Sequence, residues 1–89
     1  MEISFDPAKD VANAEKHGVS LALALDLEWD LLLFELDTRR DYGEVRMIGY
    51  APIDDRLYCV VFTDRGSERR VISLRKANPR EVKRYAEND

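Results

Sequence analysis

The spacing of apolar positions changes twice along the chain, and it divides the sequence into a helical start, a region of strands and a helical end. Asp6-Pro7 suits the start of a first helix, because Asp caps helices and Pro fits their first turn. Gly18 suits the position that ends this helix. Ser20 can cap a second helix that begins with "LALAL". Its leucines alternate as in a strand, but alanine and leucine both favour helix, so two N-terminal helices are predicted.

Four apolar runs with the spacing of strands come next. They are "LLLFEL" from residue 31, "EVRMIGYA" (44–51), "RLYCVVFT" (56–63) and "ERRVISLRKA" (68–77). The third run is apolar on both alternating faces, as in a central strand that is covered on each side. Turn residues at 52–55 and 64–67 leave only short connections, so an antiparallel meander of three to four strands is predicted.

The last predicted element is a short C-terminal helix. Asn78, Pro79 and Glu81 occupy the positions of a capping box, and the apolar stripe that follows is Val82, Tyr85 and Ala86. Two helices, a meander and a final helix make an α+β fold, with residues 1–89 forming a single domain.

Strand parity assigns faces within the run at 68–77. Ile72 and Leu74 share one face, which is expected to be core, whereas Val71, Ser73 and Arg75 share the other. Arg75 and Lys76 then lie at the end of the strand, beside the N-terminus of the last helix.

Size and composition limit the classes of function. The chain has 89 residues, of which 45% are hydrophobic and 36% charged, so we expect a globular domain with a shallow surface site. Cys59 is the single cysteine, lies in an apolar run and is expected to be buried. One His and one Cys exclude the usual zinc ligand sets, and neither a metal nor a cofactor is expected. With no signal-peptide pattern and no apolar run of membrane length, a cytoplasmic location is expected.

Charge is distributed unevenly. The formal net charge is −4, yet residues 65–84 hold eight basic and two acidic side chains, whereas residues 1–64 hold six basic and fourteen acidic. Such asymmetry favours a polyanionic or acidic partner, with a merely solvated charged face as the alternative. A helix N-terminus beside Arg75 and Lys76 favours phosphate, and RNA-binding residues are expected at Arg70, Arg80, Lys83, Arg84 and Tyr85.

A second group of charges lies at residues 37–46. Arg39, Arg40 and Arg46 alternate there with acidic residues, around Tyr42 and a turn-forming Gly43. A solvated hairpin is one interpretation. The other is that Glu44 accepts a proton while Arg46 stabilises developing phosphate charge, with Arg39 and Arg40 binding RNA.

His17 is the single histidine and lies at the predicted end of the first helix. It can act as a favourable charge at a helix C-terminus. Alternatively it can transfer a proton in RNA cleavage without metal, because a 2′-OH must lose a proton and the leaving 5′-oxygen must gain one.

Taken in order, three segments resemble the BrnT toxins of bacterial type II toxin–antitoxin systems. The segments are "FDPAKDVANAEKHGVS" (5–20), "DYGEVR" (41–46) and "RRVISLRKANPRE" (69–81). The resemblance runs from Ile3 to Tyr85. It implies a RelE-like fold and a ribonuclease that slows translation and is silenced by a BrnA-type antitoxin, which also binds operator DNA. Residues 21–44 are richer in leucine than the family pattern, which indicates a variant antitoxin interface or a contact between copies.

Catalytic roles are predicted for Arg75, Lys76, Glu44, Arg46 and His17, because RNA cleavage without a metal needs positive charge on the phosphate and proton transfer at two oxygens. Arginine suits the phosphate because its planar fork binds two oxygens and stays charged. A non-catalytic module that binds an antitoxin or nucleic acid needs the same cationic surface and remains the alternative. A small structural domain of unrelated function is the third possibility.

Overall fold

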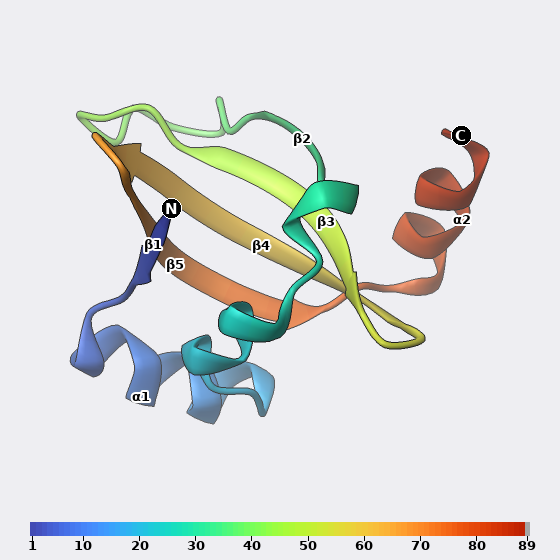
Figure 1. The fold of residues 1–89 in the computed structure, drawn as a ribbon, viewed down its shortest axis with the longest axis horizontal. Coiled ribbons are helices and arrows are strands. Elements are labelled where there is room, and N and C mark those ends of the chain that lie inside the picture. The colour runs from blue at the N-terminus through green and yellow to red at the C-terminus, as the bar shows by residue number, and fades with distance from the viewer. Residues whose placement is uncertain (89) are drawn as a thin grey trace.

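A five-stranded mixed sheet forms the body of the protein. The computed structural model describes residues 1–88. The order of elements is β1 (Glu2–Ser4), α1 (Pro7–His17), the 3₁₀ helices η1 (Leu21–Asp26) and η2 (Trp29–Leu31), β2 (Leu33–Leu36), β3 (Met47–Ile53), β4 (Arg56–Arg65), β5 (Glu68–Lys76) and α2 (Pro79–Glu87) (Figure 1). The strand order is β1-β5-β4-β3-β2. Strands β2 to β5 form the predicted antiparallel meander, and β1 pairs in parallel with β5.

Two parts of the predicted architecture are wrong. The sheet has five strands rather than three to four. Strand β1 was not predicted, because it is only three residues long and its pairing with β5 joins residues far apart in the sequence. The second N-terminal helix is the 3₁₀ helix η1, which Ser20 caps as predicted. Leu21 and Ala24 of η1 and Leu27, which caps its C-terminus, are buried and recur every three positions, which is the period of a 3₁₀ helix.

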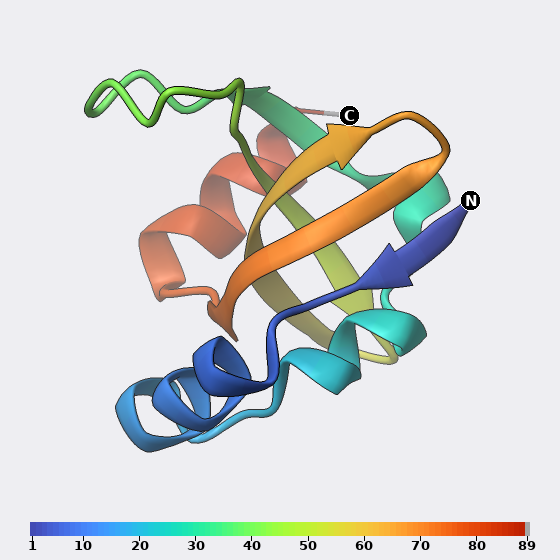
Figure 2. The same ribbon diagram turned by 90° about the vertical axis from the view of Figure 1, so that its left-hand side faces the viewer.

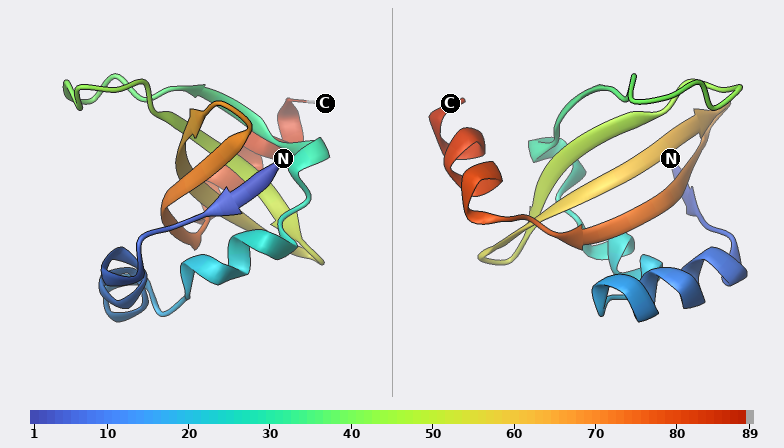
Figure 3. Two further views of the ribbon diagram at one scale, coloured as in Figure 1. Left: turned by 60° about the vertical axis from the view of Figure 1, so that its left-hand side comes forward. Right: turned by 180° about the vertical axis from the view of Figure 1, so that it is seen from behind.

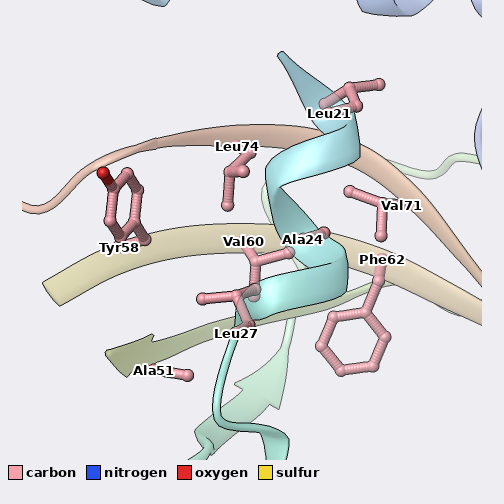
Figure 4. Packing of buried hydrophobic residues seen from close by; sticks show 9 residues of the cluster. All are labelled: Leu21, Ala24, Leu27, Ala51, Tyr58, Val60, Phe62, Val71 and Leu74. Atoms are coloured by element: carbon pink, nitrogen blue, oxygen red, sulfur yellow. The ribbon is translucent and has the colours of Figure 1, made fainter. Parts of the chain in front are cut away.

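The core lies between η1 and one face of the sheet, which we call the core face. Figure 4 shows the η1 residues directed toward Val60 and Phe62 of β4 and toward Leu74 of β5. Trp29 meets the Phe62 ring edge to face, with centroids 5.5 Å apart. Residues 57–63 of β4 are all buried, so the prediction of a central strand covered on both faces is confirmed.

A β-bulge changes the predicted parity of β5. Val61 pairs with Ser73 and Phe62 with Val71, which leaves Ile72 without a partner in β4. Val71 therefore joins Leu74 on the core face, and Ile72 does not; the prediction was wrong for both. Ser73 and Arg75 lie opposite the core face as predicted, and we call their side the pocket face.

Caps and a side-chain clamp fix the two α-helices. Asp6 accepts a hydrogen bond from the Ala8 N–H (2.8 Å), Gly18 has φ 76°, and the α2 capping box is complete, so these predictions are confirmed. Asn13 of α1 is buried, donates to the Leu74 carbonyl (2.8 Å) and accepts from the Leu74 N–H (3.1 Å). Its amide thus takes the place of a neighbouring strand beside β5.

The pocket face is framed by helices and by the loop of residues 37–46. In Figure 2, α1, α2 and this loop all lie toward the left of the sheet, and the view from behind in Figure 3 shows α1 and α2 at different ends of the strands. Within residues 1–88, each helix is too short or too polar to cross a membrane.

Candidate functional site

A hollow on the pocket face gathers basic side chains from three segments. Its volume is about 430 Å³, and its floor includes Val61 and Ser73. The side chains that carry or can carry positive charge come from α1, the 37–46 loop and β5, namely Lys9, Lys16, His17, Arg39 and Arg75. Within the described part of the chain, no acidic side chain lines this hollow. We call it the cationic pocket.

One face of α1 supplies most of the cationic pocket. Asn13 lies four residues after Lys9, and Lys16 and His17 lie three and four residues after Asn13, so the four residues share a broad face. The Asn13 clamp on Leu74 fixes that face against β5. Sequence analysis missed Lys9 and Lys16 as site residues, although their spacing with His17 was a signal that could have found them.

Arg75 is held in place by Glu81, the third residue of α2. The two side chains form a bidentate pair, with both nitrogen–oxygen distances 2.8 Å. Glu81 also accepts from the Asn78 N–H (2.9 Å) and from the Tyr50 hydroxyl (3.1 Å). The buried carboxylate therefore joins β5, β3 and the start of α2, and it fixes the direction of the Arg75 guanidinium.

This network changes the acidity of its members. The Arg75 guanidinium is the main cause that lowers the pKa of Glu81 from 4.5 to about 2. Burial, followed by the nearby Cys59 and Glu81, raises the pKa of Tyr50 to about 12. At neutral pH Glu81 is therefore charged and Tyr50 remains a hydrogen-bond donor.

Arg39 lines the cationic pocket from the 37–46 loop, in which Asp37 binds both Arg39 and Tyr42. The buried Asp37 carboxylate accepts two bonds from the Arg39 side chain, both of 2.8 Å, and one of 3.1 Å from the Tyr42 hydroxyl. The bond from Arg39 is the main cause that holds the pKa of Asp37 well below its usual range. These bonds join Asp37 to Arg39 and Tyr42, while the Arg39 side chain remains 66% exposed.

His17 lies at the edge of the cationic pocket, at the end of α1. Partial burial and the positive charges of Lys16 and Arg75 lower the pKa of His17 below its ordinary value of 6.5. Its imidazole is therefore mainly neutral at neutral pH, which is the form that accepts a proton.

Cys59 is buried in the floor of the same hollow, as its apolar surroundings predict. Burial raises the pKa of its thiol above the ordinary value of 9.0. The side chain is therefore protonated at neutral pH and unsuited to nucleophilic attack.

The predicted pair of Glu44 and Arg46 lies outside the cationic pocket. Glu44 pairs with Arg65 at 3.0 Å and with Arg46 at 3.5 Å, while the Arg46 guanidinium stacks 4.1 Å from the Tyr42 ring centroid. The bond from Arg65 is the main cause that lowers the pKa of Glu44, so its carboxylate becomes a weaker base.

The other predicted RNA-binding residues are spread over the surface. Arg70 pairs with Glu68 at 3.8 Å. Arg84 and Tyr85 line a different hollow, between α2 and β2. Four further residues lie exposed and outside the cationic pocket, namely Arg40, Lys76, Arg80 and Lys83. Of the predicted catalytic and RNA-binding set, the structure brings only His17, Arg39 and Arg75 together in this pocket.

Several basic side chains of the C-terminal region are neutralised by ion pairs. Besides the Arg75–Glu81 pair, Arg65 pairs with Glu44 and Arg69 pairs with Asp64 (2.8 Å). Arg69 also stacks on Phe62, with 4.3 Å between the guanidinium carbon and the ring centroid. The charge excess of residues 65–84 is therefore partly used within the fold.

The fold and the site define a small α+β protein with a pocket lined by basic side chains on one sheet face. A family model described as the ribonuclease toxin, BrnT, of type II toxin–antitoxin systems matches residues 5–81. The chain belongs to this family, as its sequence motifs indicated, and membership implies an antitoxin partner. The match includes every basic residue of the cationic pocket as well as Glu81. No curated protein matches the chain closely enough to count as a relative.

Proposed function

We propose that the protein is an endoribonuclease toxin that cleaves RNA in the cationic pocket without a metal ion. The observation that carries this proposal is the convergence of Lys9, Lys16, His17, Arg39 and Arg75 on a hollow that no acidic side chain of residues 1–88 lines. Positive charge that is fixed in advance stabilises a phosphate transition state without reorganisation.

The scissile phosphate binds between Arg39 and Arg75 in this mechanism. Each guanidinium is held by a carboxylate, Asp37 or Glu81, so its direction is set before RNA arrives. Guanidinium nitrogens that are not engaged by those carboxylates donate to the phosphate oxygens. These donors neutralise the charge that develops on the phosphate as the 2′-oxygen attacks.

Proton transfer is assigned to α1. Neutral His17 takes the proton of the 2′-OH while the 2′-oxygen forms a bond to phosphorus. The bond between phosphorus and the 5′-oxygen then breaks. Lys9 or Lys16 donates a proton to that leaving oxygen. The products are a 2′,3′-cyclic phosphate and a free 5′-OH, so the step consumes no water, and the proposed proton transfers use only side chains of the protein.

Membership of a family of ribonuclease toxins of type II toxin–antitoxin systems supports a proposed cellular role. In this proposal, cleavage of cytoplasmic RNA inhibits translation, and a BrnA-type antitoxin neutralises the toxin and carries any contact with operator DNA. Helices packed on an antiparallel meander support the assignment to a RelE-like fold.

The four lysines of the chain provide a matched test. Lys9 and Lys16 line the cationic pocket, whereas Lys76 and Lys83 lie exposed outside it. Replacing either pair by glutamine changes the net charge equally. Cleavage of a short single-stranded RNA is measured in excess EDTA. The pocket pair should lose about a hundredfold or more in rate, and the outer pair much less.

Equal rates for the two double variants would refute the assignment of the site. Activity that vanishes in EDTA and returns with Mg²⁺ would refute the metal-independent mechanism. Binding of RNA without cleavage under either condition would support the non-catalytic module instead.

A further inference from the structure

Strand β2 forms an unpaired edge of the sheet. It is the last strand in the order β1-β5-β4-β3-β2, and within residues 1–88 it pairs with β3 alone (Figure 3). The Asp37 N–H donates to the Arg46 carbonyl at 2.8 Å, which continues the β2–β3 ladder. Because hydrogen-bonded pairs alternate in an antiparallel ladder, the N–H and C=O groups of Phe34 and Leu36 point away from β3.

Large apolar side chains are exposed along this edge. Phe34 is 57% exposed, Leu36 58%, Leu31 51% and Val45 62%. Edge strands of soluble proteins are ordinarily protected by charged side chains, by proline, by a bulge or by very short length. β2 is four residues long and has no lysine, no proline and no bulge, and Glu35 is its single charged residue. An apolar edge with so little protection marks a surface that another chain covers.

Two hollows between β2 and α2 provide room beside the edge. Each has a volume of about 250 Å³, and both are lined by Leu33, Tyr85 and Asn88. An added strand would direct alternate side chains into these hollows and the others over Phe34 and Leu36 on the opposite face.

The charge of the edge identifies the kind of strand that fits. Residues 26–35 contain four acidic side chains and no basic one. Among the residues that line the two hollows, Asp30, Glu35 and Glu81 are acidic and Arg84 alone is basic. A second copy of β2 would place Glu35 close to another Glu35, and such a like-charge pair is unfavourable.

We propose that β2 accepts an extended basic segment of another protein as a sixth strand. The segment alternates apolar residues, which cover Phe34 and Leu36, with Lys or Arg residues, which meet Glu35 and Asp30. Backbone bonds to Phe34 and Leu36 hold it, and the alternation sets its register. None of Phe34, Leu36, Glu35 and Asp30 lines the cationic pocket; among the described residues, Ile48 alone lines both that pocket and a hollow beside β2.

Amide hydrogen exchange on the full chain tests the backbone pairing. The probe is a synthetic peptide that alternates valine and lysine, and the reference peptide alternates valine and glutamate. The lysine peptide should slow exchange of the Phe34 and Leu36 amides by about tenfold or more, and the glutamate peptide should not. Protection that is absent, or that lies elsewhere on the protein, would overturn the proposal.

Matched variants test the side chains. Phe34→Lys with Leu36→Lys adds two charges at the edge, and Val11→Lys with Val82→Lys adds them at exposed positions on α1 and α2. The edge variant should bind the lysine peptide about tenfold more weakly, while the control should bind like wild type. Equal loss in both variants would count against β2. Sedimentation of wild type alone should show monomers, and a dimer that the edge variant abolishes would assign β2 to a second copy instead.

Discussion

Replacement of Glu81 by glutamine should cost the protein much of its stability. The carboxylate is nearly buried and accepts four hydrogen bonds, two from Arg75, one from the Asn78 N–H and one from Tyr50. Its pKa is lowered from 4.5 to about 2. That change corresponds to roughly 3 kcal/mol of stabilisation at neutral pH, since a pKa difference of one between the folded and unfolded states corresponds to about 1.4 kcal/mol. Glutamine keeps the volume but turns an N–H₂ group toward the Arg75 guanidinium.

Arg75 is partly exposed and can turn toward water in the variant, so we expect a loss of about 2–3 kcal/mol rather than the full value. For a domain of this size, the melting temperature should fall by roughly 10–20 °C. Glu87→Gln is the control, because Glu87 lies exposed on the same helix. Urea unfolding followed by Trp29 fluorescence measures the free energy of unfolding of both variants, and thermal unfolding followed by circular dichroism measures their melting temperatures.

The pH dependence gives an independent check with a defined sign. Because the pKa of Glu81 is depressed in the folded protein, its stabilisation is complete above about pH 4.5 and is lost as pH falls through about 2. The gap between wild type and Glu81→Gln should therefore narrow over that interval. A variant that unfolds at the same urea concentration as wild type, or a gap independent of pH, would refute this reasoning.

Three further predictions concern the site and its support. His17→Gln should abolish cleavage with an unchanged melting temperature, and the wild-type rate should begin to fall only below about pH 6.5, because the His17 pKa is lowered; a profile without this limb would contradict the base role. Arg75→Ala should reduce the cleavage rate by about a hundredfold or more, whereas Lys76→Ala should not, and equal losses would contradict the pocket. Asn13→Ala should cost about 2–3 kcal/mol in urea unfolding, because the buried Leu74 N–H and C=O both lose a partner; a cost near zero would refute the clamp.

The sequence predicts those parts of the fold that depend on neighbouring residues. The caps at Asp6, Gly18 and Asn78 are local signals, and all three are found in the structure. The pairing of β1 with β5 joins residues far apart in the chain, so a three-residue strand carries no signal of its own. The bulge at Ile72 depends on the register of β4, and no parity rule applied to β5 alone can reveal it.

The residues of the candidate site could be predicted in part, but their arrangement in space could not. His17, Arg39 and Arg75 could each be named from residue type and position, but their convergence depends on how α1 and the 37–46 loop meet the sheet. The pairing of Arg75 with Glu81 was missed because Glu81 was already explained by the capping box. Glu81 both completes the capping box and pairs with Arg75, and the capping-box motif predicts only the first of these roles.

The internal ion pairs have a consequence for the kinetics of encounter. Asp37, Glu81 and other carboxylates neutralise the arginines that bear much of the local charge, while the whole chain keeps a net charge of −4. At low ionic strength, where the Debye length reaches about 30 Å at 0.01 M salt, an approaching RNA strand meets the net negative charge of the chain and is repelled. Moderate salt should therefore speed association, even though it weakens the final contacts in the pocket. For the proposed ribonuclease, random collision rather than long-range electrostatic steering would then set the rate at which RNA is found.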